Sequence, residues 1–279
     1  MTVVIATRDR RETLLATLDR LAKLPERPAV AVVDNASHDG TAAAARRHPV
    51  GSTVIELHEN RGAAGRNAGV LAAATEYVAF NDDDSWWEPG ALATAERLFD
   101  EHLDLAVIAA RVLVGPARRL DPTCAVMAAS PLDHDRGSPG PRVLGFVACA
   151  AVVRRSAFLA AGGFERRLGI GGEEELLAID LAARGHRLAY VDEVTAVHQP
   201  ARAGRPRRNR GTLRNGLLIA WLRRPGRDAL RRSFRLLTRH RDRRQAALAA
   251  LDALRAARWV VAERRAVRGA LARELRALD

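Results

Sequence analysis

The chain has 279 residues, 48% of them hydrophobic and 28% charged, which is enough for the core of one large α/β domain or two modest ones and excludes a wholly disordered chain, a collagen and a disulfide scaffold. The net charge of +12 is uneven: residues 201–279 hold 23 arginines against 6 acids, a net of +17, whereas residues 1–200 carry a net of −5. The positive charge therefore belongs to a C-terminal region and does not mark the whole protein as a nucleic-acid binder.

Several sequence features bear on where the protein works. Cys124 and Cys149 are too few for a disulfide framework or a structural zinc site, which favours a reducing compartment. No apolar stretch approaches the length of a membrane span, and residues 2–7 predict a strand rather than a signal peptide. We therefore expect a cytoplasmic protein.

The first 112 residues alternate between β-rich apolar runs and helix-like segments, which is typical of a parallel sheet with crossover helices. Four strands are predicted, at Val3–Ile5, Val30–Asp34, Val54–Leu57 and Tyr77–Asn81. Helix-forming composition and apolar spacing predict helices at Glu12–Leu24, Thr41–Arg47, Arg66–Thr75 and Pro89–His102. We expect these segments to form repeated β-α units.

The second part of the chain is less regular. After an apolar segment at residues 105–114, the proline-rich stretch 115–142 is expected to be largely loop, with one edge strand at most. Ordered elements are then predicted at Val143–Val153, Ser156–Ala161, Glu173–Arg184 and Arg187–Val191. Beyond Pro200 the pattern changes to Arg-rich amphipathic helices.

Three consecutive acids, Asp82, Asp83 and Asp84, stand at the carboxyl end of a predicted strand, which is where ligands bind in open α/β sheets. Adjacent carboxylates repel one another, and a hard divalent cation bridged to phosphate oxygens would relieve that repulsion. The alternative is a solvated acidic loop, the commoner origin of an isolated acidic triplet.

Two further motifs follow other predicted strands. Residues 32–41 place Asp34 at a strand end, where it can accept a hydrogen bond from a nucleobase, whereas Asp39, taken alone, is better explained as a turn or cap residue. Residues 60–69 form a glycine-rich turn that opens a helix, and Arg66 there can face an anionic diphosphate. Each motif alone is weak evidence, because any tight β-α turn needs glycine.

Taken in chain order, these motifs resemble the family 2 glycosyltransferases with the GT-A fold. The resemblance covers about residues 1–200 and includes Gly162-Gly163-Phe164-Glu165 and Gly172-Glu173-Glu174-Glu175. It implies an α/β fold of the GT-A type, Rossmann-like with a mostly parallel central sheet and flanking helices. The implied parts are a nucleotide-sugar-binding half (1–112), an acceptor-side half (113–200) and an Arg-rich helical C-terminal extension (201–279).

The resemblance also implies a donor site. Thr7, Arg8, Asp34 and Asp39 would line the pocket for the base and ribose, with Arg66 near the diphosphate. The implied donor is a nucleoside-diphosphate sugar, with a UDP-sugar as the default and deoxythymidine and guanosine as open alternatives.

A metal site is implied by the same resemblance. Asp82 and Asp84 would form an Asp-x-Asp motif, with Asp83 also at the substrate and Asp84 as the more direct ligand of Mg²⁺ or Mn²⁺. Such a metal neutralises charge on the leaving diphosphate. His198 stands where many relatives have a histidine that touches the metal or the diphosphate, although a single histidine is more often a satisfied surface or core residue.

An inverting transfer also needs a base that takes the proton of the acceptor hydroxyl. The resemblance gives this role to Glu174, although glutamate replaces the usual aspartate, Leu176 stands where a second acid is common, and Asp180 where arginine often stands. Glu173, expected at the substrate, and Glu175 remain alternative bases. Three glutamates in a first helical turn also stabilise the helix dipole, which explains the acids but not their place in the family order.

Trp86 and Trp87 directly follow the acidic triplet. Because adjacent residues point in different directions, we expect one to pack and the other to contact substrate, and we assign the contact to Trp87. The stretch 115–142 is expected to form an acceptor-side lid. Cys124 and Cys149 are expected to be packed thiols, because neither has an activating histidine nearby in sequence.

The sequence thus predicts a metal-dependent, inverting glycosyltransferase that acts on a sugar, lipid-linked or natural-product acceptor in cell-surface polysaccharide or glycoconjugate synthesis. The rival is a non-catalytic nucleotide-sugar-binding or scaffold protein of the same fold, suggested by the altered segment around residues 173–180. A dinucleotide-dependent oxidoreductase is disfavoured, because Ala6-Thr7-Arg8-Asp9 follows the first strand in place of Gly-x-Gly-x-x-Gly.

The Arg-rich region 201–279 has three interpretations: peripheral contact with anionic lipid at the inner face of the membrane, nucleic-acid binding, or ordinary solvated helices. Acids among the arginines, such as Asp228 and Asp252, favour solvated faces in part. Nucleic acid is the weakest of the three, because the sequence has no recognisable reading motif or aromatic platform, and we predict no nucleic-acid partner.

Overall fold

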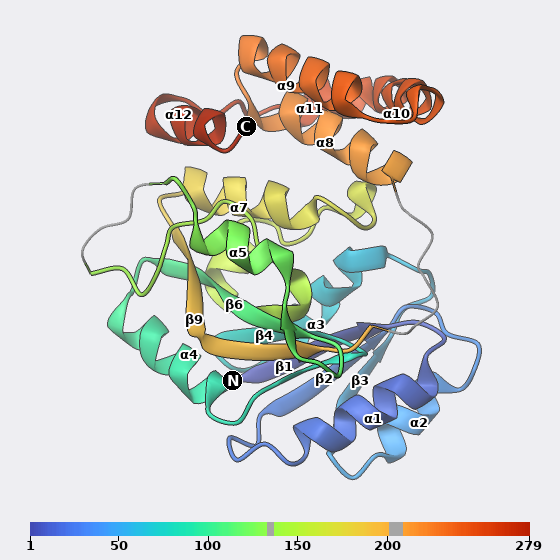
Figure 1. The fold of residues 1–279 in the computed structure, drawn as a ribbon. Helices are drawn as coiled ribbons and strands as arrows, with labels where there is room; N and C mark the ends of the chain where they lie inside the picture. The colour runs from blue at the N-terminus through green and yellow to red at the C-terminus, as the bar shows by residue number, and fades with distance from the viewer. Residues whose placement is uncertain (133–136, 201–208) are drawn as a thin grey trace.

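The computed structural model describes residues 1–132, 137–200 and 209–279, and one mixed sheet carries the fold (Figure 1). Its first four strands are parallel neighbours: β1 (Thr2–Thr7), β2 (Ala29–Asp34), β3 (Thr53–Glu56) and β4 (Tyr77–Asp82). The helices between them are α1 (Arg11–Leu21), α2 (Thr41–Arg47) and α3 (Arg66–Ala72). The β-α pattern predicted for the first part of the chain is confirmed.

The rest of the chain extends the same sheet, in the order β3-β2-β1-β4-β8-β6-β9-β5 with β7 paired to β6. These later elements are β5 (Ser85–Trp87), α4 (Ala91–Glu101), β6 (Leu105–Val114), β7 (Arg119–Leu120), α5 (Pro122–Ala128), β8 (Ala151–Arg154), α6 (Arg155–Ala160), α7 (Glu173–Ala183) and β9 (Arg187–His198). β8 runs antiparallel to both β4 and β6, whereas β9 runs parallel to β6. The sheet is therefore mixed on the side beyond β4.

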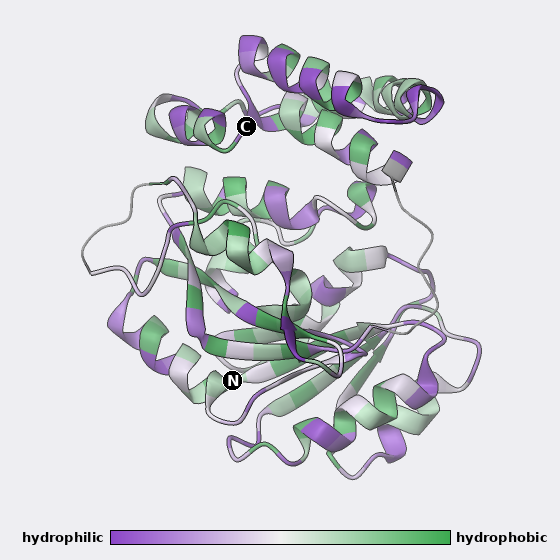
Figure 2. Ribbon diagram, in the orientation of Figure 1, coloured by the Kyte–Doolittle hydropathy of each residue, from purple (hydrophilic) through white to green (hydrophobic). Residues whose placement is uncertain are grey.

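The interior of the sheet is apolar, as Figure 2 shows for its central strands. Val3, Val4 and Ile5 of β1 have no exposed surface, as expected for strands covered on both faces. α3 lies directly on this layer because its Gly69 lacks a side chain: a Cβ there would come within 2.4 Å of Val4 Cγ1. This close packing fixes the turn that precedes α3 at the edge of the sheet.

The proline-rich stretch expected to be largely loop contains a helix, α5. The Asp121 side chain caps it by accepting a hydrogen bond from the Thr123 backbone N–H at 2.8 Å. Pro122 occupies the first turn, where a missing N–H is tolerated. The sequence Asp121-Pro122 is therefore a helix start signal, but the high proline content of the stretch favoured a loop instead.

Two strands also differ from the sequence expectation. β9 continues to His198 instead of ending at Val191, because a register shift lets it resume pairing with β6 at Thr195. β5 was not predicted, and it pairs with the end of β9 through Ser85 and Trp87. Both extensions depend on partners that are distant in sequence.

The C-terminal residues form a helical layer over α7 (Figure 1). Its described helices are α8 (Asn209–Arg223), α9 (Gly226–Arg239), α10 (Arg243–Arg255), α11 (Ala257–Glu263) and α12 (Gly269–Ala277). A second apolar core joins this layer to α7, with Ile179 of α7 and Ile219 of α8 fully buried in it. Arg223 also pairs with Asp180 of α7, Nη2 to Oδ2 at 2.9 Å. None of the described helices has both the length and the apolar character needed to cross a bilayer.

Candidate active site

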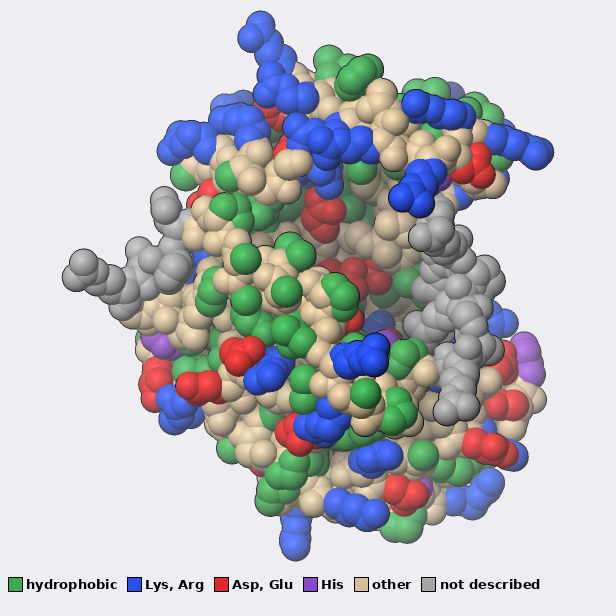
Figure 3. All heavy atoms as spheres, in the orientation of Figure 1, with side chains coloured by type: hydrophobic (Ala, Val, Ile, Leu, Met, Phe, Trp, Pro, Cys, Tyr) green, Lys and Arg blue, Asp and Glu red, His purple; other side chains and the backbone are tan. Residues whose placement is uncertain are grey.

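A cleft of about 510 Å³ opens at the carboxyl ends of β1 and β4, within the size range of small-molecule sites. Figure 3 shows acidic side chains in the hollow between the sheet and the C-terminal helices. The described residues that line the cleft include Thr7, Arg8, Arg10, Asn35, Arg66, Asp82, Asp83, Cys149, Glu173, Glu174 and His198. The structure thus brings together most of the site residues predicted from sequence.

The three consecutive acids at the end of β4 have different surroundings. Asp82 is partly exposed to the cleft, whereas Asp83 and Asp84 are only 5% and 3% exposed. Asp83 accepts a hydrogen bond from Thr7 Oγ1 at 2.8 Å, and its Oδ1 lies 2.8 Å from Arg10 Nε. Burial raises the pKa of Asp83 to about 6, although Thr7 and Arg10 act in the opposite direction.

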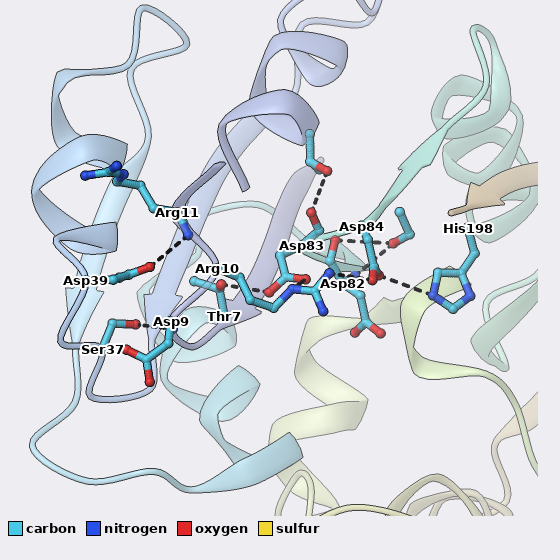
Figure 4. Close-up of polar contacts among 12 residues, drawn as sticks. Thr7, Asp9, Arg10, Arg11, Ser37, Asp39, Asp82, Asp83, Asp84 and His198 are labelled. Atoms are coloured by element: carbon cyan, nitrogen blue, oxygen red, sulfur yellow. Dashed lines mark hydrogen bonds and ion pairs between the residues drawn. The ribbon is translucent and has the colours of Figure 1, made fainter. Parts of the chain in front are cut away.

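The surroundings of Asp84 fit a divalent cation. Its Oδ1 lies 3.2 Å from His198 Nε2 (Figure 4), close to the separation of about 3 Å between adjacent ligands that each sit about 2.1 Å from one octahedral ion. Ligand atoms of Asp82, Cys149 and His198 also lie within 4.8 Å of one another. Carboxylate oxygens with one imidazole are a donor set that divalent ions accept.

The glycine-rich turn is fastened to the end of β2 by one side chain, Asn35. Its Nδ2 donates to the Gly62 carbonyl at 3.2 Å, and its Oδ1 accepts from the Arg61 backbone N–H at 3.2 Å. A Cβ at Gly65 would come within 2.7 Å of the same amide oxygen, so glycine is needed there. The turn leads into Arg66, which is 7% exposed and pairs with Asp82.

The two aspartates predicted for the base and ribose pocket brace the loops around the cleft. Asp34 is 3% exposed and accepts hydrogen bonds from the backbone N–H and the hydroxyl of Ser37. Asp39 accepts from the Thr41 backbone N–H at 3.0 Å and from the Arg11 backbone N–H at 3.1 Å. Hydrogen bonds, first of all from the Thr41 hydroxyl, lower the pKa of Asp39. Neither aspartate is among the described residues that line the cleft, and capping accounts for Asp39.

The three glutamates at the start of α7 face different surroundings. Glu173 is 3% exposed and accepts a hydrogen bond from the Gly171 backbone N–H, so it fastens the turn that leads into its own helix. Burial, and then the charge of Glu173, raises the pKa of Glu174 to about 8. Burial also raises the pKa of Glu175, and the nearby Arg232 acts against it. Of the three, Glu173 and Glu174 line the cleft.

The two tryptophans of β5 point in different directions, as the alternation of a strand requires. Trp87 is 1% exposed and belongs to the core. Trp86 is partly exposed, and the Arg20 guanidinium lies 3.8 Å from its ring centroid. The prediction that Trp87 contacts substrate is wrong, because core packing takes up its whole ring.

Two residues of the cleft were not predicted to act there. Arg10 lies across two acids, with its Nη2 also 2.8 Å from Asp84 Oδ2 (Figure 4). Its place as the second arginine after the first strand, two residues beyond Arg8, was the available signal. Cys149 is buried as expected but also lines the cleft, and burial raises the pKa of its thiol well above the ordinary value. Only the pairing of β4 with β8 brings Cys149 to the acids, so local sequence carried no signal for it.

The chain is also similar in sequence to known glycosyltransferases. The family model described as glycosyl transferase family 2 matches residues 2–160. Uncharacterized glycosyltransferases of Mycobacterium tuberculosis (strain H37Rv) and Mycobacterium bovis are each 31% identical over 218 residues, which is 78% of this chain and 93% of theirs.

Solved structures similar to this one are glycosyltransferases with the GT-A fold. The mannosyltransferase PcManGT from Pyrobaculum calidifontis, in complex with GDP-Man and Mn²⁺, has a TM-score of 0.62 at 20% identity, over 99% of this chain and 85% of that one. TarS of S. aureus, in complex with UDP-GlcNAc, has a TM-score of 0.61 at 17% identity, over 91% of this chain and 71% of that one. The predicted GT-A fold with its helical C-terminal region is confirmed, and the chain belongs to glycosyl transferase family 2.

Proposed function

We propose that the protein is a metal-dependent, inverting glycosyltransferase that moves a sugar from a nucleoside-diphosphate sugar to an acceptor hydroxyl, in cell-surface polysaccharide or glycoconjugate synthesis. One observation carries the proposal. Acids at the end of β4, His198 at the end of β9 and Glu174 at the start of α7 meet at one cleft. Three elements far apart in the chain contribute titratable groups to one place, which packing alone does not require.

Asp84 and His198 are the proposed ligands of Mg²⁺ or Mn²⁺, with Asp82 beside them. When bound, such an ion neutralises the charge that develops on the leaving diphosphate. The complex of PcManGT with GDP-Man and Mn²⁺ supports a divalent ion for this family of folds. The protein's own part is to hold the carboxylate and the imidazole in place: Asp84 directly precedes β5, and His198 of β9 pairs with Ser85 of β5.

The rest of the donor would contact the polar wall of the cleft. Thr7 and Arg8 at the end of β1 are proposed to face the base and ribose, within loops that Asp34 and Asp39 brace. Arg66 is proposed to contact the diphosphate. A UDP-sugar is the proposed donor, supported by the UDP and UDP-GlcNAc complexes of TarS, with a GDP-sugar as the first alternative because PcManGT binds GDP-Man.

Glu174 is the proposed base. The acceptor oxygen attacks the anomeric carbon, its proton passes to the Glu174 carboxylate, and the bond from that carbon to the diphosphate oxygen breaks. Displacement from the face opposite the diphosphate inverts the anomeric configuration. A pKa of about 8 keeps the carboxyl close to neutral working pH, where it can both take up and release the proton. Glu173, which lines the same cleft, is proposed to contact the substrate.

Calorimetric titration with UDP, GDP and dTDP, each with Mn²⁺ and again with EDTA, tests the donor site. We expect one nucleotide to bind in Mn²⁺ only, and Asp84→Ala to weaken that binding by about 100-fold, since a metal contributes several kcal/mol at such a site. The matched control is Glu193→Ala, which removes a 76% exposed carboxylate from the same strand as His198. Folded wild-type protein that binds none of the three would contradict the proposal.

We further propose that the C-terminal helices contact anionic lipid on the cytoplasmic side of a membrane. Leu230 and Phe234 of α9 are 59% and 72% exposed, and Arg227 and Arg231 lie exposed beside them. An apolar face with cationic neighbours suits a membrane interface. We expect co-sedimentation with phosphatidylglycerol vesicles at low salt, weakened by Phe234→Ser, and no sedimentation of the wild type would exclude this contact.

A further inference from the structure

A second cleft adjoins the candidate active site and differs from it in its lining. It measures about 730 Å³ and lies between α5, the segment 143–146, the start of α7 and the end of α12. Most of its described lining is apolar and includes Val126, Met127, Leu144, Phe146 and Leu278. Figure 3 shows hydrophobic side chains on the surface beside the acidic hollow.

The two clefts share one side chain that carries chemistry, Glu174. The polar cleft of the candidate active site, called the donor cleft below, and the apolar cleft are therefore neighbours at this glutamate. A hydroxyl presented from the apolar cleft therefore meets the Glu174 carboxyl while the polar cleft is occupied by a nucleotide. This placement distinguishes the apolar cleft from an unrelated surface groove.

The apolar lining is open to solvent. Val126 of α5 is 72% exposed, and Leu278 at the end of α12 is 40% exposed. Exposed apolar side chains that border a cleft are typical of a surface that a ligand covers. Because these side chains come from opposite sides of the cleft, an apolar body placed between them would cover both.

The charges at this cleft are of one sign. Among the described residues, the charged side chains that line it are Glu174 and Glu175, and no arginine lines it. Arg224 and Arg232 act on Glu175 through their charge but do not line the cleft, and they pair with the carboxylate of Asp279 at 3.0 and 3.1 Å. A phosphate group in this cleft would find no arginine among the described lining residues, whereas a neutral molecule needs no cationic partner.

We propose that this cleft binds the acceptor, and that the acceptor carries its reacting hydroxyl on an apolar body that is uncharged or cationic, rather than on a body that bears phosphate. The inference rests on the proposed function and deepens it by naming the acceptor class. The hydroxyl faces Glu174, which takes its proton, and the apolar body lies between Val126 and Leu278. The displacement itself is the one described above.

Two probes with the same ring system test the proposal: 2-naphthol, which is neutral and carries a hydroxyl, and 2-naphthyl phosphate. Binding of each to the full-length protein is followed by fluorescence titration. We expect 2-naphthol to bind at least about tenfold more tightly than the phosphate, because a phosphate dianion would lose water in this apolar cleft without an arginine among the described lining residues to pair with. No binding of 2-naphthol, or equal or tighter binding of the phosphate, would overturn the proposal.

A matched pair of variants locates the binding. Val126→Glu places a charge in the cleft at an exposed position and is expected to weaken 2-naphthol binding by about tenfold. The control is Leu254→Glu, at a residue that is 70% exposed and lines a separate apolar groove among α8, α9, α10 and α11. If Leu254→Glu removes the binding and Val126→Glu does not, the probe occupies that other groove and the proposal fails.

Nucleotide titration of the same proteins separates this inference from the function on which it rests. Val126→Glu is expected to bind nucleotide in Mn²⁺ as the wild type does, because the residue does not line the donor cleft. Normal nucleotide binding without naphthol binding would contradict the proposed acceptor class but not the proposed transferase function. Naphthol binding without any nucleotide binding would remove the transferase, and the acceptor role with it.

Discussion

The two clefts that share Glu174 differ in the polarity of the side chains that line them. In the donor cleft, acids are held by partners of the same cleft: Asp83 by Thr7 and Arg10, and Asp82 by Arg66. The larger cleft is mostly apolar, and its described charges are acids alone. In the proposed function, the charged cleft serves an anionic, metal-bound donor, and the apolar cleft serves the acceptor.

The two clefts also arise from different parts of the architecture. The donor cleft forms where strands of one sheet end at a common edge, so its side chains are placed by strand register. The apolar cleft is enclosed by helices, α5 on one side and α12 at the far end of the chain on the other. Among the described helices and strands, only α7 contributes to both, and its first turn carries the titratable group Glu174, which they share.

The largest effect is expected from Glu174→Gln, which keeps the shape of the boundary residue and removes its basicity. Turnover should fall by about 10²–10⁴-fold, the usual contribution of a general base. Nucleotide binding in Mn²⁺ should stay within about twofold, which distinguishes lost chemistry from lost structure. Release of nucleoside diphosphate in a steady-state assay measures the first quantity, and calorimetry measures the second.

Glu175→Gln is the matched control for that experiment. Its carboxyl lies one residue further along α7 and near Arg232, and it does not line the donor cleft. It should cost far less turnover than Glu174→Gln. A larger loss of turnover in Glu175→Gln than in Glu174→Gln would show that Glu174 is not the base.

The pH dependence of turnover tests Glu174 as the base independently of the variants. A base acts in its deprotonated form, and burial together with the charge of Glu173 raises the pKa of Glu174 to about 8. Turnover should therefore rise by roughly tenfold per pH unit as pH increases toward 8, and level off above it. A rate profile between pH 5 and 10 measures this. A plateau that begins near pH 5 would mean that the base has an ordinary carboxyl pKa.

How much of this site was predictable from sequence depends on how far each contact reaches along the chain. The helix Thr41–Arg47 was predicted with the bounds it has, because local composition and capping decide it. The acids after β4 were predicted because strand ends in such folds carry ligand-binding residues. These are short-range signals that periodicity and turn chemistry carry.

The remaining features depend on register between distant strands. Cys149 reaches the cleft through the pairing of β8 with β4, and the end of β9 places His198 beside Asp84 after a register shift. The burial of Trp87 follows from the pairing of β5 with β9. Single-residue slips in such pairings reverse which face a side chain occupies, and local sequence does not fix them.

A smaller effect is expected from Arg10→Ala, which tests whether charge pairing supports the donor cleft. The change leaves Asp83 and Asp84 buried without their cation, and breaking a fully buried pair costs about 3–5 kcal/mol. Because the Arg10 side chain is 25% exposed, we expect about 2 kcal/mol in the free energy of unfolding. Mn²⁺ should restore part of this loss by supplying positive charge to the same acids.

Chemical denaturation with and without Mn²⁺ measures both quantities. Arg11→Ala is the control: the next arginine is 49% exposed, and its side chain lies 4.0 Å from Glu12. It should change stability little and show no special response to Mn²⁺. An equal loss in both variants would mean that Arg10 contributes general helix or loop stability rather than a counter-charge.

The smallest effect is expected from Thr7→Val, which removes one hydroxyl from the donor cleft while keeping its shape. Thr7 donates to the Asp83 carboxylate, so the loss should be about 1–2 kcal/mol while that group is charged. Asp83 has its pKa raised to about 6 by burial, so this loss of stability should be full above pH 7 and shrink below pH 5, where the carboxyl is protonated.

Thr17→Val is the control, because Thr17 donates to the Asp83 backbone carbonyl at 2.7 Å, which does not titrate. The loss of unfolding free energy relative to the wild type should therefore be larger at pH 8 than at pH 5 for Thr7→Val. For Thr17→Val it should be the same at both pH values. If both variants behave alike, the Thr7 hydroxyl is a packing contact rather than a support for the Asp83 charge.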